Sequence, residues 1–255
     1  MGTAFLVILT VVLPTLVAVL GLFLVQRLVA PGLREEHTGF AGTIYQVLGT
    51  TYAVLLAFVA VIVWGDYQTA ESTMESEANE LAGIYFLANR FSDSDREQVH
   101  DLARSYARTV VEEEWPLMEQ GKTSSRASSL LSELRLSLQN LDIRTDADLI
   151  LYDQGLTRMH DLANARRLWL VAVTEGLPTI LWTVLLGGGM VTVCSTYLFG
   201  LKNKWVHALM VAALTLVICG ILLTIGLFEY PFAGQVRVKP TAFEEVLRIF
   251  QDTGR

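Results

Sequence analysis

YQVLGTTYAVLLAFVAVIVW, residues 45–64, is followed directly by GDYQTAESTMESEANELAGIYFLANR, residues 65–90. The first segment carries no Asp, Glu, Lys or Arg and is about as long as the roughly 20 residues that a membrane-spanning helix needs. The second segment is acidic, yet its apolar side chains keep helical steps of three, four or seven residues, and no proline interrupts them. Together the segments predict one long helix that begins in a membrane and continues beyond it.

The composition indicates a protein that lies partly in a bilayer. Hydrophobic residues make up 52% of the 255 residues and the mean hydropathy is +0.43, which is too apolar for most soluble domains. Charged residues still contribute 18%, too many for a chain that lies wholly in a membrane. The net charge of -7 argues against a basic surface that would neutralise phosphates, so nucleic acid is not expected as a partner.

Three further apolar segments are long enough to cross a bilayer, which makes the lipid bilayer a partner of the chain. Spans are predicted at about residues 4–26, 45–64, 178–199 and 206–228. Pro14 lies inside the first span and predicts a kink, because its ring displaces a backbone hydrogen bond. The third span contains Gly187, Gly188 and Gly189 without the Lys and Ser/Thr of a phosphate loop, which favours close helix packing or a flexible point.

Helix signals fill the segment between the second and third spans. Ser94 with Glu97, and Thr145 with Asp148, have the spacing of N-terminal capping boxes. Pro116 predicts that another helix kinks or ends nearby. No strand pattern of comparable length is present, so this segment is predicted to be an α-helical bundle.

The predicted fold is therefore an all-α membrane protein with four transmembrane helices and an extramembranous α-helical bundle inserted between spans 2 and 3. Its parts are a transmembrane hairpin over residues 1–64, the bundle over 65–177, a second hairpin over 178–228, and a tail over 229–255 with a short amphipathic helix. Four spans place both termini and the bundle on one side of the membrane. The basic residues near the spans are balanced between the two sides, so they leave the orientation open.

The sequence contains no motif that predicts an enzyme. Its four histidines are scattered, and neither an HExxH nor a GxSxG pattern is present. Cys194 and Cys219 both lie in apolar runs without a CxxC or Cys/His neighbour, which argues against a disulfide framework or a thiolate metal site. No cofactor is expected apart from calcium.

Acidic residues gather directly after the second span. Asp66, Glu71 and Glu75 would form rings of negative charge at a pore mouth if several subunits assembled around this helix. Glu77 and Glu80 are three residues apart on one helix face, and a pair of carboxylates is a candidate ligand set for calcium. A solvated helix face is the alternative interpretation of each group.

The order of several short motifs resembles the bacterial DUF4239 or bestrophin-like proteins over nearly the whole chain. These motifs are Trp64 at the end of the second span, Glu77-Ala78 with Leu81, Arg167-Leu168 before Pro178, Leu181-Trp182, Pro231-Phe232-x-Gly234, Pro240 and Phe243. The resemblance implies a homo-oligomeric channel, pentameric in bestrophins, with four spans per subunit and an acidic calcium site near the membrane. It also implies an inner-membrane location with the bundle on the cytoplasmic side.

The resemblance to bestrophins also implies that the second span lines the pore. The candidate lining residues are Thr50, Thr51, Leu55, Phe58, Ile62 and Asp66. Inorganic ions are then the partners, and the acidic mouth favours cations because it would repel anions. The alternative function is a non-conducting membrane scaffold or sensor whose bundle binds another protein. No Asp, Glu, Lys or Arg lies within the four spans, which argues against a transporter more than against a channel.

Overall fold

The computed structural model describes residues 3–29, 38–143, 145–174, 176–200 and 203–253. These residues form helices and turns and contain no β-strand, which confirms the all-α prediction for this part of the chain. The helices are α1 (Thr3–Val7), the π-helical turn η1 (Ile8–Val12), α2 (Leu13–Leu28), α4 (Thr38–Leu87), the 3-10 turn η2 (Ala88–Arg90), α5 (Asp93–Thr109), the π-helical turn η3 (Val110–Glu114), α6 (Trp115–Met118), α7 (Ser125–Gln139), α8 (Asp146–Thr174), α9 (Thr179–Thr196), α10 (Lys204–Phe228) and α11 (Thr241–Thr253).

Four helical segments in the described ranges are long and apolar enough to cross a membrane. They are Phe5–Leu28, Gly42–Arg90, Thr179–Thr196 and Lys204–Phe228. Most of the second lies in α4, an uninterrupted helix of 50 residues. At about 1.5 Å per residue such a helix is about 75 Å long, more than twice the roughly 30 Å of a bilayer's hydrocarbon core. The predicted continuation of this helix past its apolar half is confirmed.

The chain divides into two compact units. The first, here called the membrane unit, comprises Met1–Gly65 and Leu177–Glu229, and the second, the bundle unit, comprises Asp66–Gly176 and Tyr230–Arg255. The C-terminal tail therefore shares its unit with the helices that follow the second span. Each unit therefore combines two segments that are far apart in the sequence but contact each other in the structure.

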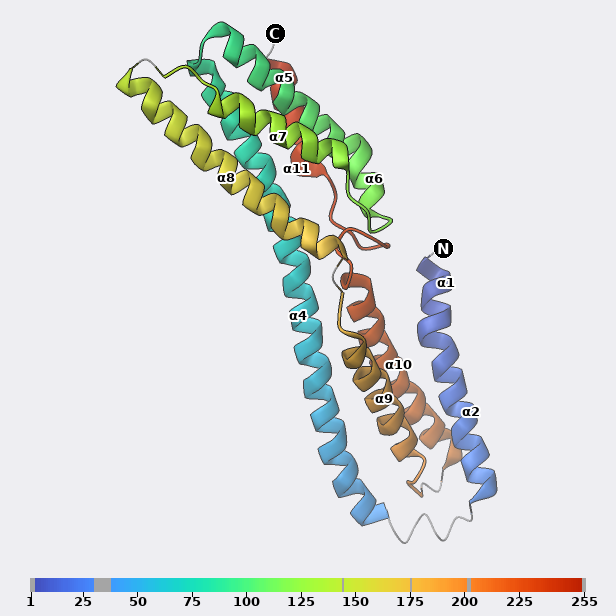
Figure 1. Cartoon of the computed structure of the whole chain (residues 1–255). Helices are drawn as coiled ribbons and strands as arrows, with labels where there is room; N and C mark the ends of the chain where they lie inside the picture. Colours follow the sequence, from blue (N-terminus) through green and yellow to red (C-terminus); the bar gives the residue numbers. More distant parts are fainter. Residues whose placement is uncertain (1–2, 30–37, 144, 175, 201–202, 254–255) are drawn as a thin grey trace. The chain divides into compact units, whose positions relative to one another are not determined.

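In the membrane unit, apolar side chains lie both inside and outside. Helix α10 packs against α2 and α9 (Figure 1), and Leu22, Leu185 and Val211 are almost fully buried between the helices. On the outer faces, Leu20 and Leu209 are 67% and 71% exposed. A soluble protein rarely exposes so much contiguous apolar surface, so these outer faces suit contact with lipid.

The two prolines that predicted helix distortions each follow a π-helical turn. The turn η1 (Ile8–Val12) precedes Pro14, and η3 (Val110–Glu114) precedes Pro116. Proline has no N–H, and its ring collides with the carbonyl four residues earlier, so a wider turn at that point accommodates the ring. The disturbance at Pro14 that the sequence predicted therefore takes the form of a π-turn.

The bundle unit is built around aromatic side chains. Tyr85 on α4, Tyr106 on α5 and Trp169 on α8 are fully buried. The tail adds Phe243 and Phe250 from α11 to the same core, and both are also fully buried. Helix α11 is thus amphipathic as predicted, and its apolar face packs inside the bundle unit.

The helix caps agree with the sequence at one site and differ at another. Thr145 and Asp148 form the predicted reciprocal cap at the start of α8, with N–H to oxygen distances of 2.8 and 3.2 Å. The predicted Ser94 cap is wrong, because Ser92 caps α5 and accepts a hydrogen bond from the backbone N–H of Asp95 at 3.3 Å. The SDSD repeat offers the same spacing at two neighbouring serines, so the motif alone could not choose between them.

Candidate functional site

Helix α4 buries a single stripe along its membrane half. Tyr52, Leu56, Val59 and Val63 recur at helical spacing and are 2–6% exposed. The remaining faces of this half point away from the rest of the membrane unit. A helix that buries so little of its surface within its own chain has faces available for contact with lipid or with other protein surfaces.

The predicted pore-lining residues lie mostly on these outward faces. Phe58 and Ile62 are 66% and 54% exposed, Thr50 and Thr51 are exposed, and Leu55 is partly buried. In the bundle unit, Asp66, Glu71 and Glu75 are all exposed. None of the three acidic residues is buried in the core of the bundle, so their charges are accessible to ions. Their assignment to a pore remains a prediction.

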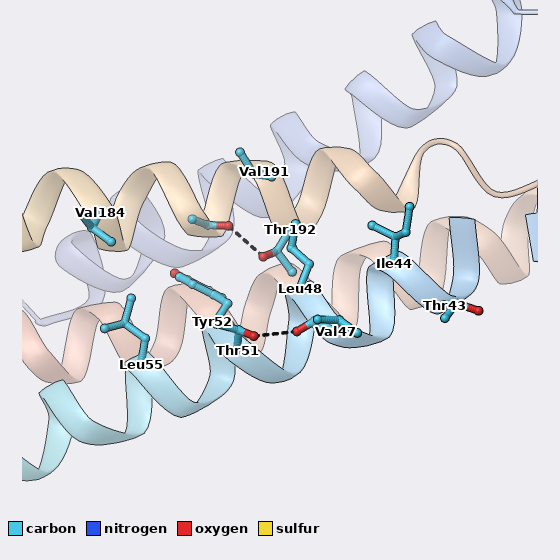
Figure 2. A pocket seen from close by; sticks show the side chains of 11 residues that line it. Thr43, Ile44, Val47, Leu48, Thr51, Tyr52, Leu55, Val184, Val191 and Thr192 are labelled. Carbon is cyan, nitrogen blue, oxygen red and sulfur yellow. Dashed lines mark hydrogen bonds between the residues drawn. The ribbon is translucent and has the colours of Figure 1, made fainter. Parts of the chain in front are cut away.

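A groove of about 600 Å³ runs between α4 and α9 in the membrane unit. It is lined by Thr43, Ile44, Val47, Leu48, Thr51, Tyr52, Leu55, Val184, Gly188, Val191 and Thr192 (Figure 2). The threonines do not make it polar, since Thr51 donates its hydroxyl to the Val47 carbonyl at 2.9 Å and Thr192 to the Gly188 carbonyl at 2.8 Å. With these hydroxyls bonded within their own helices, the groove offers mainly apolar surface.

Tyr52 connects the two walls of this groove. Its side chain lies toward α9 in Figure 2, and its hydroxyl donates a hydrogen bond to the Leu185 carbonyl at 2.7 Å. A Cβ atom at Gly188 would lie 2.7 Å from the tyrosine ring, and one at Gly189 would lie 2.8 Å from its hydroxyl. The close-packing interpretation of the glycine triplet is confirmed at these two positions, and Tyr52 is the partner that the sequence did not identify.

The bundle unit contains a buried cluster of charged and polar side chains. Arg166 is 3% exposed, and its guanidinium donates two hydrogen bonds to the Glu114 carboxylate at 2.7 and 2.9 Å. Glu77 is fully buried and accepts hydrogen bonds from the Tyr106 hydroxyl and the Trp169 indole N–H. Burial raises the pKa of Glu77 to about 7, although Arg166 and these two hydrogen bonds act in the opposite direction.

The structure gives separate partners to the two carboxylates that predicted a calcium site. Glu77 belongs to the buried cluster, whereas Glu80 accepts a hydrogen bond from Arg158 at 2.9 Å near the surface. The described residues contain no group of three or more His, Cys, Asp or Glu side chains that could hold a metal ion. A calcium role for Glu77 and Glu80 stays a prediction that no observation tests. Glu77 is fully buried, and both of its carboxylate oxygens already accept hydrogen bonds from protein groups.

Comparison with known proteins identifies relatives of the whole chain. The bacterial bestrophin homologue from Klebsiella pneumoniae has a crystal structure with a TM-score of 0.72 and 14% sequence identity, covering 96% of this chain and 98% of that one. A form of that homologue with one substitution gives a TM-score of 0.70 and 12% identity over 94% of this chain and 99% of that one. At such low identity these matches show a shared fold. No protein of curated function matches the chain.

The sequence itself also matches a known family. The Bestrophin-like domain matches residues 12–243, which include most of the first apolar segment and all of Thr179–Thr196 and Lys204–Phe228, together with Gly42–Arg90. The resemblance inferred from short motifs is confirmed, and the chain is a multi-pass membrane protein. On this evidence the chain belongs to the Bestrophin-like family.

Proposed function

We propose that the chain is one subunit of a homo-oligomeric ion channel whose pore is lined by α4 and whose mouth attracts cations. The observation that carries the proposal is the exposure of α4, which buries one stripe in its membrane half and leaves Phe58 and Ile62 outward. The exposed Asp66, Glu71 and Glu75 follow the apolar half of the same helix. Rings of such carboxylates would raise the local cation concentration at a pore entrance.

The arrangement in the membrane belongs to the same proposal. The membrane unit would span the inner membrane, and the bundle would be an extramembranous insertion between the second and third spans. The family resemblance implies five subunits and a cytoplasmic bundle. The apolar outer faces of the membrane unit support its placement in a membrane, since their exposed leucines suit contact with lipid or with neighbouring subunits.

The proposal is tested by ion flux into proteoliposomes under opposed potassium and chloride gradients. The wild-type protein should give a reversal potential near that of potassium. The variant Asp66→Asn/Glu71→Gln/Glu75→Gln should lose cation preference, because the mouth no longer carries negative charge. Runs with calcium and with a chelator test calcium modulation in the same preparation.

A matched control separates the position of the charges from their number. The variant Asp93→Asn/Asp101→Asn/Glu133→Gln also removes three exposed acidic groups from the bundle unit, but none lies on α4. It should conduct with the wild-type selectivity. A chloride reversal potential in the wild type, or an equal effect of both triple variants, would contradict the cation-attracting mouth.

A scaffold or sensor remains the second candidate because the bundle unit exposes apolar side chains. Leu136 is 56% exposed, and Leu149 and Ile150 on α8 are 53% and 59% exposed. Such side chains on a unit outside the membrane favour a protein partner. Absence of flux under every gradient would support this function over conduction.

A further inference from the structure

The buried cluster of the bundle unit holds more negative than positive charge. Two carboxylates, Glu77 and Glu114, and one guanidinium, Arg166, are each at most 3% exposed. With both carboxylates ionised, the cluster carries one net negative charge inside an apolar core. A buried charge without a partner costs several kcal/mol in proteins, so the cluster gains stability by binding one positive charge.

The hydrogen bonds show which carboxylate is paired with Arg166. The Glu114 carboxylate accepts hydrogen bonds from both terminal nitrogens of the Arg166 guanidinium, at 2.7 and 2.9 Å. Its Oε1 also accepts the backbone N–H of Ser124 at 2.9 Å. Three donors, two of them on a cation, satisfy an ionised carboxylate well. Glu114 and Arg166 therefore form the neutral pair of the cluster.

Glu77 is the carboxylate without a cation of its own. Its Oε1 accepts from the Tyr106 hydroxyl on α5, and its Oε2 accepts from the Trp169 indole on α8. Both donors are neutral groups. The nearest cationic atom is Nη1 of Arg166 at 3.6 Å, and this nitrogen already donates to Glu114 and to the Tyr106 oxygen.

We propose that Glu77 is a proton-binding site and that its protonation changes the hydrogen bonds that join α4 to α5 and α8. A proton on Oε2 would face the Trp169 N–H, so two donors would meet and that bond would be lost. A proton on Oε1 would donate to the Tyr106 oxygen, and the tyrosine hydroxyl hydrogen would have to turn away. Proton uptake removes a buried charge in both cases. On Oε2 it breaks the interhelical hydrogen bond to Trp169, and on Oε1 it reverses the direction of the one to Tyr106.

The other groups that face Glu77 do not compete for this proton. Arg166 on α8 remains charged because a guanidinium is not deprotonated in proteins. Burial raises the pKa of Tyr106 on α5 well above its ordinary value, so its hydroxyl stays neutral. Glu114 on η3 is paired with Arg166 and accepts the backbone N–H of Ser124. Trp169 on α8 does not titrate, which leaves Glu77 as the site of proton uptake.

The pH dependence has a definite sign. The pKa of Glu77 is raised by burial from 4.5 to about 7, so the folded protein binds more protons than the unfolded chain between these two values. The stabilising contribution of this group is then complete below the lower value and is lost as the pH rises through the higher one. Acidification toward pH 5.5 should therefore raise the melting temperature through Glu77.

The test is the melting temperature of the full-length protein in detergent, measured between about pH 5.5 and about pH 8.5 in the presence of a calcium chelator. Glu77→Gln should lose the part of the pH dependence centred near neutrality and should be more stable than the wild type at the alkaline end. Glu133→Gln, which changes an exposed carboxylate on α7, should keep the wild-type profile. Identical profiles for the wild type and Glu77→Gln would overturn the proposal.

Two measurements make the assignment specific. Tyr106→Phe removes one donor to the ionised carboxylate, so the midpoint of the profile should move to higher pH, and an unmoved midpoint would contradict the assigned contact. Infrared titration of the wild-type protein should show a carboxylic acid C=O band that disappears near neutral pH. If the band is absent, the proposal that Glu77 binds a proton is overturned. This result comes from the wild-type protein, so it does not require that any variant folds. Neither readout depends on conduction, so both outcomes are independent of the proposed channel function.

Discussion

Removing Arg166 should destabilise the bundle far more than removing an arginine at its surface. The variant Arg166→Met keeps the length of the aliphatic chain but deletes the three hydrogen bonds that the guanidinium makes to Glu114 and Tyr106 at 2.7–2.9 Å. Glu114 would keep the Ser124 N–H, and Glu77 would keep its two neutral donors. Two fully buried carboxylates would then remain without a cation.

The magnitude follows from this burial. Breaking a buried ion pair by removing one partner costs about 3–5 kcal/mol, because the charge left behind is not compensated. For a chain of this size, about 1 kcal/mol lowers the melting temperature by roughly 2–4 °C, so Arg166→Met should lower it by about 10 °C. The matched control is Arg158→Met, since the Arg158 and Glu80 side chains are 44% and 24% exposed. A pair so accessible to water contributes less than about 1 kcal/mol, or no more than about 3 °C.

Tryptophan fluorescence is a suitable assay, because Trp169 lies in the same cluster and reports its unfolding. The loss caused by Arg166→Met should be smaller near pH 5.5 than near pH 8.5, since the unpaired carboxylates can then take up protons. Adding Glu114→Gln should restore part of the stability, because it removes one of the uncompensated charges. Equal effects of Arg166→Met and Arg158→Met, or a loss that is independent of pH, would refute this account of the cluster.

Three further changes test helix packing and one helix cap. Gly188→Ala should cost about 1–3 kcal/mol because its Cβ would collide with the Tyr52 ring, whereas Gly187→Ala meets no atom within 4 Å and should be neutral or slightly stabilising in thermal unfolding. Asn203→Ala should cost about 1 kcal/mol, because the side chain accepts the N–H groups of Trp205 and Val206 at the start of α10, and retention of the wild-type melting temperature would remove this cap. Phe243→Ala should cost about 3–5 kcal/mol and increase hydrogen exchange in α11, since the ring is fully buried in the bundle core, and unchanged exchange would argue against that docking.

The sequence could predict the features that depend on neighbours along the chain. The apolar segments, the long α4 and the amphipathic α11 each follow from residue spacing within one helix. The cap at Thr145 was likewise readable from a residue three positions away. The same local signal failed at α5, where two serines offered equivalent spacing and Ser92 rather than Ser94 became the cap.

The tertiary structure decided what each helix face meets. Glu77 and Glu80 are three residues apart, and their spacing predicted a shared role, yet one is fully buried and the other accepts a hydrogen bond from Arg158 near the surface. The partners of Glu77 lie 29 and 92 residues away, at Tyr106 and Trp169, so no local pattern includes them. Helical spacing determines which residues share a face. Whether that face is solvated or buried depends on which distant helices pack against it, and that packing sets the charge and the pKa of Glu77.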